Sequence, residues 1–180
     1  MANLLRGARP IYLVGMMAAG KSSVGRGLAE RLGRPFVDLD AAIELRTGTT
    51  VAEVFARHGE FDFRACEAQV LRDLPRQYPD GVVATGGGTP LHFEGMTFLR
   101  QTGTVIYLAA TEATLARRLS PQRASRPLLA GPEWRTRLRA LLAERTPVYE
   151  RAHGRYRVDD AGLREVVDGL VEQLPQVTGH

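Results

Sequence analysis

The chain has 180 residues, of which 44% are hydrophobic and 24% are charged. These values are ordinary for a globular protein, and we expect a single domain spanning residues 1–180. The net charge of +4 favours negatively charged partners. A single cysteine, Cys66, excludes an internal disulfide and a cysteine-based zinc site, and no apolar run approaches the ~20 residues of a membrane span. We therefore expect a cytoplasmic protein with no membrane partner.

Short apolar strand patterns alternate with helical patterns along the chain. Strands are predicted at residues 10–14, 36–39, 82–84, 104–109 and 156–158. Helices are predicted at residues 22–32, 41–45, 51–57, 61–78, 111–119, 134–152 and 163–174, with a break at His58-Gly59. This alternation predicts an α/β fold in three layers, α/β/α, around a mainly parallel five-stranded sheet.

Two further segments carry no apolar periodicity. Residues 120–132 are rich in arginine, proline and serine, and we expect them to form a mobile lid. Residues 175–180 are expected to form a polar tail. At the other end, Arg6 and Arg9 precede an apolar stretch that imitates a secretory signal peptide. That stretch also fits a specific strand and loop motif, which is the better interpretation.

Residues 15–22, Gly-Met-Met-Ala-Ala-Gly-Lys-Ser, match the phosphate-binding pattern of glycine, four residues, glycine, lysine and serine or threonine. In this motif backbone N–H groups and the N-terminus of the next helix face phosphate oxygens. Lys21 would reach the β- and γ-phosphates of a nucleotide, and the Ser22 hydroxyl would bind Mg²⁺. Lys21 is also the only lysine among the 24 basic residues. A compact ammonium suits a tight phosphate loop better than a planar guanidinium does.

Asp38 and Asp40 flank Leu39 at the end of a predicted strand. In an extended backbone their carboxylates would lie on the same side. One could hold Mg²⁺ through a water molecule, and the other could accept a proton from an attacking hydroxyl. The alternative is that Asp40 only caps the helix that starts at Ala41 and that Asp38 is a solvated strand end.

The remaining candidates lie after other strands and helices. Three adjacent glycines, Gly86, Gly87 and Gly88, permit close approach of the backbone to a substrate. Arg126 lies in the predicted lid, a type of segment that closes over a transferring phosphoryl group. Because ligands bind at the carboxyl ends of parallel strands, we expect all these segments to face one crevice.

Together these motifs resemble the shikimate kinases, a family of phosphate-loop proteins related to the nucleoside monophosphate kinases. The resemblance covers nearly the whole chain and includes residues 11–15 (IYLVG), 36–40 (FVDLD), 43–48 (IELRTG), Gly59-Glu60 with Phe63-Arg64, 84–88 (ATGGG), 126–129 (RPLL), Glu144-Arg145 with 147–149 (PVY), and 157–159 (RVD). It implies a five-stranded parallel sheet, a lid over ATP, and transfer of the γ-phosphoryl group of ATP to the 3-hydroxyl of shikimate, with Mg²⁺, in aromatic amino-acid biosynthesis.

The resemblance also implies roles for individual residues. Asp40 would bind the substrate hydroxyls and act as the base, and Arg64 and Arg145 would clamp the shikimate carboxylate. Arg126 would reach the phosphates from the lid, and Arg118 would pack on the adenine. The predicted catalytic residues are Asp40, Lys21 and Arg126, and the predicted metal ligands are Ser22 and Asp38. The predicted nucleotide-binding residues are Gly15, Ala18, Ala19, Gly20, Lys21, Ser22, Ser23, Arg118 and Arg126. The predicted substrate-binding residues are Asp40, Arg64, Gly86, Gly87, Gly88 and Arg145.

Two other classes of function stay open. A related kinase could phosphorylate gluconate or a nucleotide, because arginines alone do not distinguish a carboxylate from a phosphate. The same fold could also serve a non-catalytic ligand sensor or a nucleic-acid-binding protein. The sequence has no basic run with interleaved aromatic residues, which argues against nucleic acid. We expect a monomer acting on a small molecule.

Overall fold

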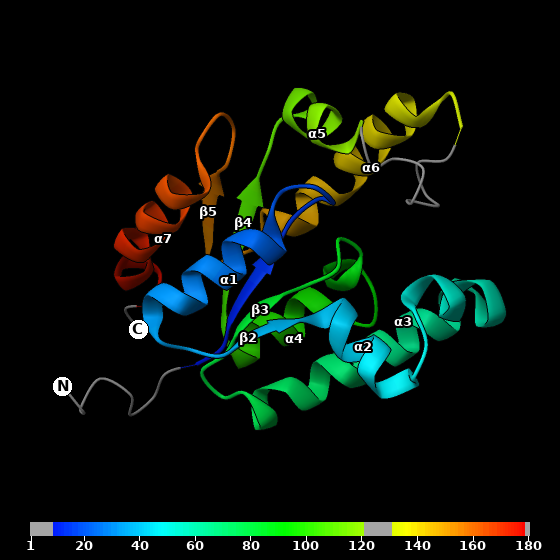
Figure 1. Ribbon diagram of the computed structural model, residues 1–180, viewed down its shortest axis with the longest axis horizontal. Helices are drawn as coiled ribbons and strands as arrows, with labels where there is room; N and C mark the ends of the chain where they lie inside the picture. Colours follow the sequence, from blue (N-terminus) through cyan, green and yellow to red (C-terminus); the bar gives the residue numbers. More distant parts are fainter. Residues whose placement is uncertain (1–8, 121–130, 179–180) are drawn as a thin grey trace.

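The computed structural model describes residues 9–120 and 131–178 of the chain. Five parallel strands form one sheet in the order β2-β3-β1-β4-β5 (Figure 1). The strands are β1 (Ile11–Val14), β2 (Phe36–Asp38), β3 (Val82–Ala84), β4 (Thr104–Ala109) and β5 (Gly154–Arg157). The prediction of a three-layer fold around a parallel five-stranded sheet is confirmed.

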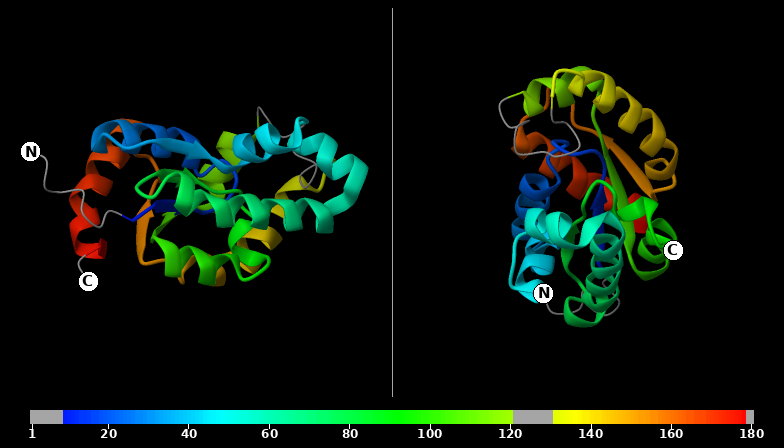
Figure 2. Two further views of the ribbon diagram at one scale, coloured as in Figure 1. Left: turned by 90° about the horizontal axis from the view of Figure 1, so that it is seen from below. Right: turned by 90° about the vertical axis from the view of Figure 1, so that its right-hand side faces the viewer.

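Helices connect the strands and cover both faces of the sheet. They are α1 (Lys21–Leu32), α2 (Leu39–Thr47), α3 (Val51–Gln77), the short 3-10 helix η1 (Thr89–Leu91), α4 (Gly95–Thr102), α5 (Glu112–Leu119), α6 (Trp134–Tyr149) and α7 (Leu163–Thr178). Helices α1 and α7 pack side by side on one face, and α3, α4 and α6 lie on the other (Figures 1 and 2). None of the helices in these described ranges is long and apolar enough to span a membrane.

The central strands are apolar in sequence because both of their faces are buried. Every residue of β1, β3 and β4 is buried, because helices cover both faces of the central strands. Strand β5 lies at the edge of the sheet, and its residues alternate between half-buried and exposed. The loops that follow β1, β3 and β4 therefore begin at strands that are packed on both faces.

Helix α3 is broken at Gly59, as predicted from the sequence. Gly59 has φ 78° and ψ 177°, a conformation that only glycine adopts readily. The first part of α3 begins with a capping box, in which the Thr50 hydroxyl accepts from the Glu53 N–H and the Glu53 carboxylate accepts from the Thr50 N–H. The part after the kink carries Arg64 toward the sheet.

Three expectations about the elements were wrong. Helix α2 begins at Leu39, so Asp38 rather than Asp40 is its N-cap, and the Asp38 carboxylate accepts from the Asp40 N–H at 3.1 Å. Helix α4 and η1 have no counterpart among the predicted elements. Helix α7 continues through Pro175 to Thr178, whereas a polar tail was expected there. Val177 packs against Gly154 of β5, and this tertiary contact stabilises the last turn of the helix beyond Pro175.

His153 lies in the turn between α6 and β5 and makes two hydrogen bonds to Val105 of β4. Its N–H donates to the Val105 carbonyl at 2.9 Å, and its Nδ1 accepts from the Val105 N–H at 3.0 Å. An imidazole can accept in this way only when Nδ1 is unprotonated. Desolvation of the ring, helped by the Arg100 and Arg9 guanidinium groups, lowers the pKa of His153 below its usual 6.5.

A lowered histidine pKa predicts a loss of stability in mild acid. As the pH falls through the unfolded-state pKa near 6.5, the unfolded chain binds a proton that the folded protein excludes. The free energy of unfolding should therefore fall between about pH 7 and pH 5. In His153→Asn the amide oxygen can still accept from the Val105 N–H, and the slope over this range should be shallower. Urea unfolding of both proteins at several pH values measures the slopes, and equal slopes would contradict this role of His153.

Candidate active site

The loop that follows β1 wraps around the Lys21 ammonium. Lys21 Nζ donates to the carbonyl oxygens of Gly15 and Met16, each at 2.8 Å, and the side chain is only 9% exposed. Gly20 has φ 100° and leads directly into α1. Ala18 and Ala19 lie inside the loop, and Ala18 has a positive φ of 61°. The loop and the N-terminus of α1 thus form a concave, positively polarised seat of the kind that binds phosphate.

Ser22 and Asp38 meet at the edge of this loop. The Ser22 hydroxyl donates to the Asp38 carboxylate at 2.6 Å, which joins the first turn of α1 to the end of β2. Asp40 lies in the first turn of α2 with an exposed side chain. The predicted extended backbone across the two aspartates is therefore wrong: Asp40 lies in a helix, and the Asp38 carboxylate, which caps that helix, accepts from the Asp40 N–H.

The three glycines after β3 lie where side chains from several elements converge. A Cβ on Gly86 would lie 2.8 Å from Glu67 Oε1 and 3.6 Å from Asp40 Oδ1. A Cβ on Gly88 would lie 2.6 Å from the Arg64 Cζ, and one on Gly87 would lie 3.2 Å from an Arg145 terminal nitrogen. Real side chains do not tolerate the two shortest of these separations. The absence of side chains at these positions lets Arg64, Arg145 and Asp40 gather around the backbone.

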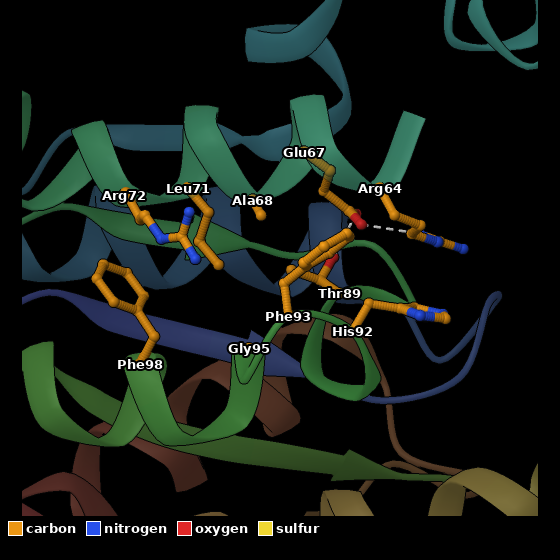
Figure 3. Close-up of a pocket in the computed structure, with 10 residues that line it drawn as sticks. All are labelled: Arg64, Glu67, Ala68, Leu71, Arg72, Thr89, His92, Phe93, Gly95 and Phe98. Atoms are coloured by element: carbon orange, nitrogen blue, oxygen red, sulfur yellow. Dashed lines mark hydrogen bonds and ion pairs between the residues drawn. The ribbon is translucent and has the colours of Figure 1, made fainter. Parts of the chain in front are cut away.

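Arg64 is held in place by a buried carboxylate. It donates to Glu67 Oε2 at 2.8 Å, and the Thr89 hydroxyl donates to Glu67 Oε1 at 2.6 Å. Figure 3 shows Arg64 and Glu67 on α3 above Thr89 and His92. The rings of Phe63 and Phe55 lie 5.0 and 5.8 Å from the guanidinium carbon. These contacts fix the orientation of the guanidinium group before any ligand binds.

Arg145 lies on α6, one turn before Tyr149. The Tyr149 hydroxyl donates to the Gly87 carbonyl at 2.6 Å. Burial raises the pKa of Tyr149 to about 12, although Arg145 acts in the opposite direction. Tyr149 therefore stays a protonated donor at neutral pH and anchors α6, with Arg145, to the glycine segment.

The charge inside this region is unbalanced. Among the described residues, the buried charged side chains are Lys21, Arg64, Arg145 and Glu67, so three are cationic and one is anionic. The Nε atoms of Arg64 and Arg145 are buried, and neither has a hydrogen-bond partner in the structure. Buried donors of this kind are costly unless they are paired. The arrangement is suited to a bound anion.

The remaining predicted nucleotide-binding residues are Arg118, Ser23 and Arg126. Arg118 lies against the back of the phosphate loop and donates to the carbonyls of Ala19 at 3.3 Å, Ala18 at 3.4 Å and Val158 at 2.9 Å. Ser23 is exposed in the first turn of α1. Arg126 and most of the predicted lid lie outside the described residues, so their predicted roles stay predictions.

Three residues of this site did not appear among the sequence candidates. Glu67 is three positions after Arg64, a spacing at which side chains meet on a helix, and this spacing could have indicated the pair. Tyr149 lies in the segment 147–149 that carries the family resemblance, but its bond to Gly87, like that of Thr89 to Glu67, joins residues distant along the chain and could not be read from local spacing.

No group of three or more histidine, cysteine, aspartate or glutamate side chains able to hold a metal ion occurs in residues 9–120 and 131–178. Mg²⁺ does not require such a group, because it commonly takes one or two protein oxygens, several waters and the phosphates of a nucleotide. The paired oxygens of Ser22 and Asp38, beside a phosphate loop, fit that mode of binding.

Comparison with known proteins agrees with this geometry. A family model described as shikimate kinase matches residues 17–175. A shikimate kinase of Symbiobacterium thermophilum is 48% identical over 168 residues, which cover 92% of this chain and 96% of the relative. A shikimate kinase of Bordetella pertussis is 47% identical over 95% of this chain and 79% of the relative.

Solved structures agree with the sequences. The structure of shikimate kinase from Acinetobacter baumannii in complex with shikimate has a TM-score of 0.87 and 38% identity, and the match covers 94% of each chain. Shikimate kinase from Aquifex aeolicus has a TM-score of 0.78 and 30% identity, over 94% of this chain and 98% of that one. In sequence and in fold, therefore, this chain belongs to the shikimate kinase family.

Proposed function

We propose that this protein transfers the γ-phosphoryl group of ATP to the 3-hydroxyl of shikimate, giving shikimate 3-phosphate and ADP. The observation that carries the proposal is the pair of buried guanidinium groups, Arg64 and Arg145, whose terminal nitrogens lie beside Gly88 and Gly87. Two planar donors are suited to a carboxylate, which shikimate carries. Membership of the shikimate kinase family supports the choice of acceptor.

The nucleotide would bind at the loop of residues 15–20. Lys21, now donating to two loop carbonyls, is within the seat that would receive the β- and γ-phosphates. Ser22 and Asp38 would hold Mg²⁺, Ser22 directly and Asp38 through water; when bound, the ion neutralises charge on the phosphates. Backbone N–H groups and the N-terminus of α1 would stabilise the charge that develops on the transferred group.

Shikimate would bind between the glycines, Arg64, Arg145 and Asp40. With its carboxylate on the two arginines, a ring hydroxyl would lie toward Asp40, on the side of the phosphate loop. The hydroxyl oxygen forms a bond to the γ-phosphorus as the bond to the ADP oxygen breaks, and its proton passes to the Asp40 carboxylate. Asp40 is suited to this role because its carboxylate is exposed to the site and its backbone is held by Asp38.

The test is release of ADP from ATP and Mg²⁺ with and without shikimate. We expect release that depends on shikimate, together with formation of shikimate 3-phosphate by mass spectrometry. Gluconate and nucleoside monophosphates should give no comparable turnover. Turnover of one of these acceptors but not of shikimate would overturn the proposed substrate and leave a kinase of the same fold.

A methyl group on Gly88 should weaken the binding of shikimate. Gly88 has φ −87°, so Gly88→Ala leaves the backbone unstrained, but its Cβ would displace the Arg64 guanidinium. We expect KM for shikimate to rise by about 10- to 100-fold, which corresponds to a loss of one charge-assisted hydrogen bond of about 1.5–3 kcal/mol. KM for ATP should change little. Gly162→Ala is a matched control, because nothing lies within 4 Å of its Cβ position. An unchanged KM in Gly88→Ala would contradict the placement of shikimate.

A further inference from the structure

A strained turn connects η1 to α4 beside the proposed substrate site. The Gly95 N–H donates to the His92 carbonyl at 2.8 Å, and the two central residues, Phe93 and Glu94, have φ values of 49° and 59°. Positive φ at both central positions is the pattern of a type I′ turn, for which glycine and asparagine are preferred. Phenylalanine and glutamate are disfavoured there, so surrounding contacts must hold this turn in place.

An aromatic pair joins this turn to α3. The rings of Phe93 and Phe61 are edge to face, with centroids 5.8 Å apart and planes at 61°. Phe61 is 74% exposed and Phe93 is 42% exposed, so the pair buries little apolar surface. Phe61 follows the kink at Gly59 by two residues and precedes Arg64 by three. The pair therefore joins the part of α3 that carries Arg64 to the turn that follows the three glycines.

We propose that Phe61 and Phe93 are positioning residues for substrate binding, which hold the kinked part of α3 so that Arg64 meets the glycine segment. The proposal rests on the proposed function for the identity of the ligand. Two features already described make such a contact important: the α-helical conformation of α3 is interrupted at Gly59, and Arg64 packs against Gly88 without room for a methyl group. Neither phenylalanine needs to touch the substrate, because both act through Arg64.

The pair can be tested by a double-mutant cycle. Phe61→Ala and Phe93→Ala should each raise KM for shikimate, and its Kd in the absence of nucleotide, by about three- to tenfold, the scale of an edge-to-face pair. The kcat and the KM for ATP should stay within about twofold. The KM for shikimate of the double variant should lie within about twofold of the higher of the two single-variant values, because each single substitution already removes the interaction. Phe61→Tyr keeps the ring and should restore near-normal binding.

Leu163→Ala is the matched control for loss of an exposed apolar side chain, because Leu163 is 51% exposed at the start of α7. It should leave KM unchanged. If the wild type phosphorylates shikimate, three results would overturn the proposal. They are a KM in Leu163→Ala raised as much as in the phenylalanine variants, additive effects of the two phenylalanine substitutions on KM, or an unchanged KM in both single variants.

A measurement without substrate separates this inference from the proposed function. If Phe61 and Phe93 restrain α3, amide hydrogen exchange at residues 59–64 should be faster in either alanine variant than in the wild type, and unchanged in Leu163→Ala. Unchanged exchange would overturn the inference whether or not shikimate is the substrate. Absence of shikimate turnover in the wild type, with faster exchange in the variants, would overturn only the proposed function.

Discussion

Asp40→Asn should lower kcat for shikimate phosphorylation by about 10²–10⁴-fold, because an amide cannot take the proton of the attacking hydroxyl. The substitution is nearly isosteric, and the Asp40 N–H would still donate to Asp38. KM for ATP should stay close to the wild-type value, because the phosphate loop is unchanged. Steady-state kinetics with a coupled ADP assay measures all of these quantities.

The control for Asp40→Asn is its folding. Asp40 lies in the first turn of α2, where a carboxylate interacts favourably with the helix dipole by about 0.3–1 kcal/mol. A Tm only a few degrees lower would therefore be expected and would not explain a large loss of kcat. Turnover within about threefold of the wild type would refute a role of Asp40 as the base.

Lys21→Ala should lower kcat by about 10²–10³-fold through loss of charge stabilisation on the transferred phosphoryl group. Lys21→Arg tests whether charge alone is sufficient. The Lys21 ammonium fits between the Gly15 and Met16 carbonyls at 2.8 Å and is 9% exposed, so the wider guanidinium has no room to lie in the same way. We expect Lys21→Arg to be nearly as impaired as Lys21→Ala.

Binding of shikimate without nucleotide is the control for both lysine variants. It should be unchanged, because Arg64 and Arg145, the proposed carboxylate ligands, come from α3 and α6, whereas Lys21 donates to the carbonyls of the phosphate loop. Near-normal kcat in Lys21→Ala would contradict its role, and near-normal kcat in Lys21→Arg would mean that any cation in the loop is sufficient.

The positions of the strands and their parallel sheet could be expected from the sequence because the central strands are buried on both faces, whereas the order of the strands was not predicted. Ile11 to Val14 and Thr104 to Ala109 read as unbroken apolar runs, and the glycines and Lys21 that follow β1 form a motif with a fixed spacing. Local signals of this kind depend on neighbours along the chain. For the same reason the break at Gly59 was predictable.

The features that were missed depend on distant contacts. Asp38 and Asp40 both suit a helix N-cap, and the pairing of β2 with β3 up to Asp38, with the bond from Ser22, decides between them. Helix α4 begins after a turn with two positive φ values at Phe93 and Glu94, which no sequence rule favours. The bond between Tyr149 and Gly87 joins residues 62 positions apart.

The charge imbalance around Arg64 and Arg145 links ligand binding to the resistance of the protein to heat. In the ligand-free protein, Arg64 and Arg145 lie beside neighbouring glycines with one buried anion, Glu67, so this poorly hydrated region carries an excess of positive charge. An anion that binds only the folded chain balances this charge, and the melting temperature should then rise with its concentration. Folding and ligand recognition are thus thermodynamically coupled, and a part of the stability of this enzyme is supplied by the metabolites it binds.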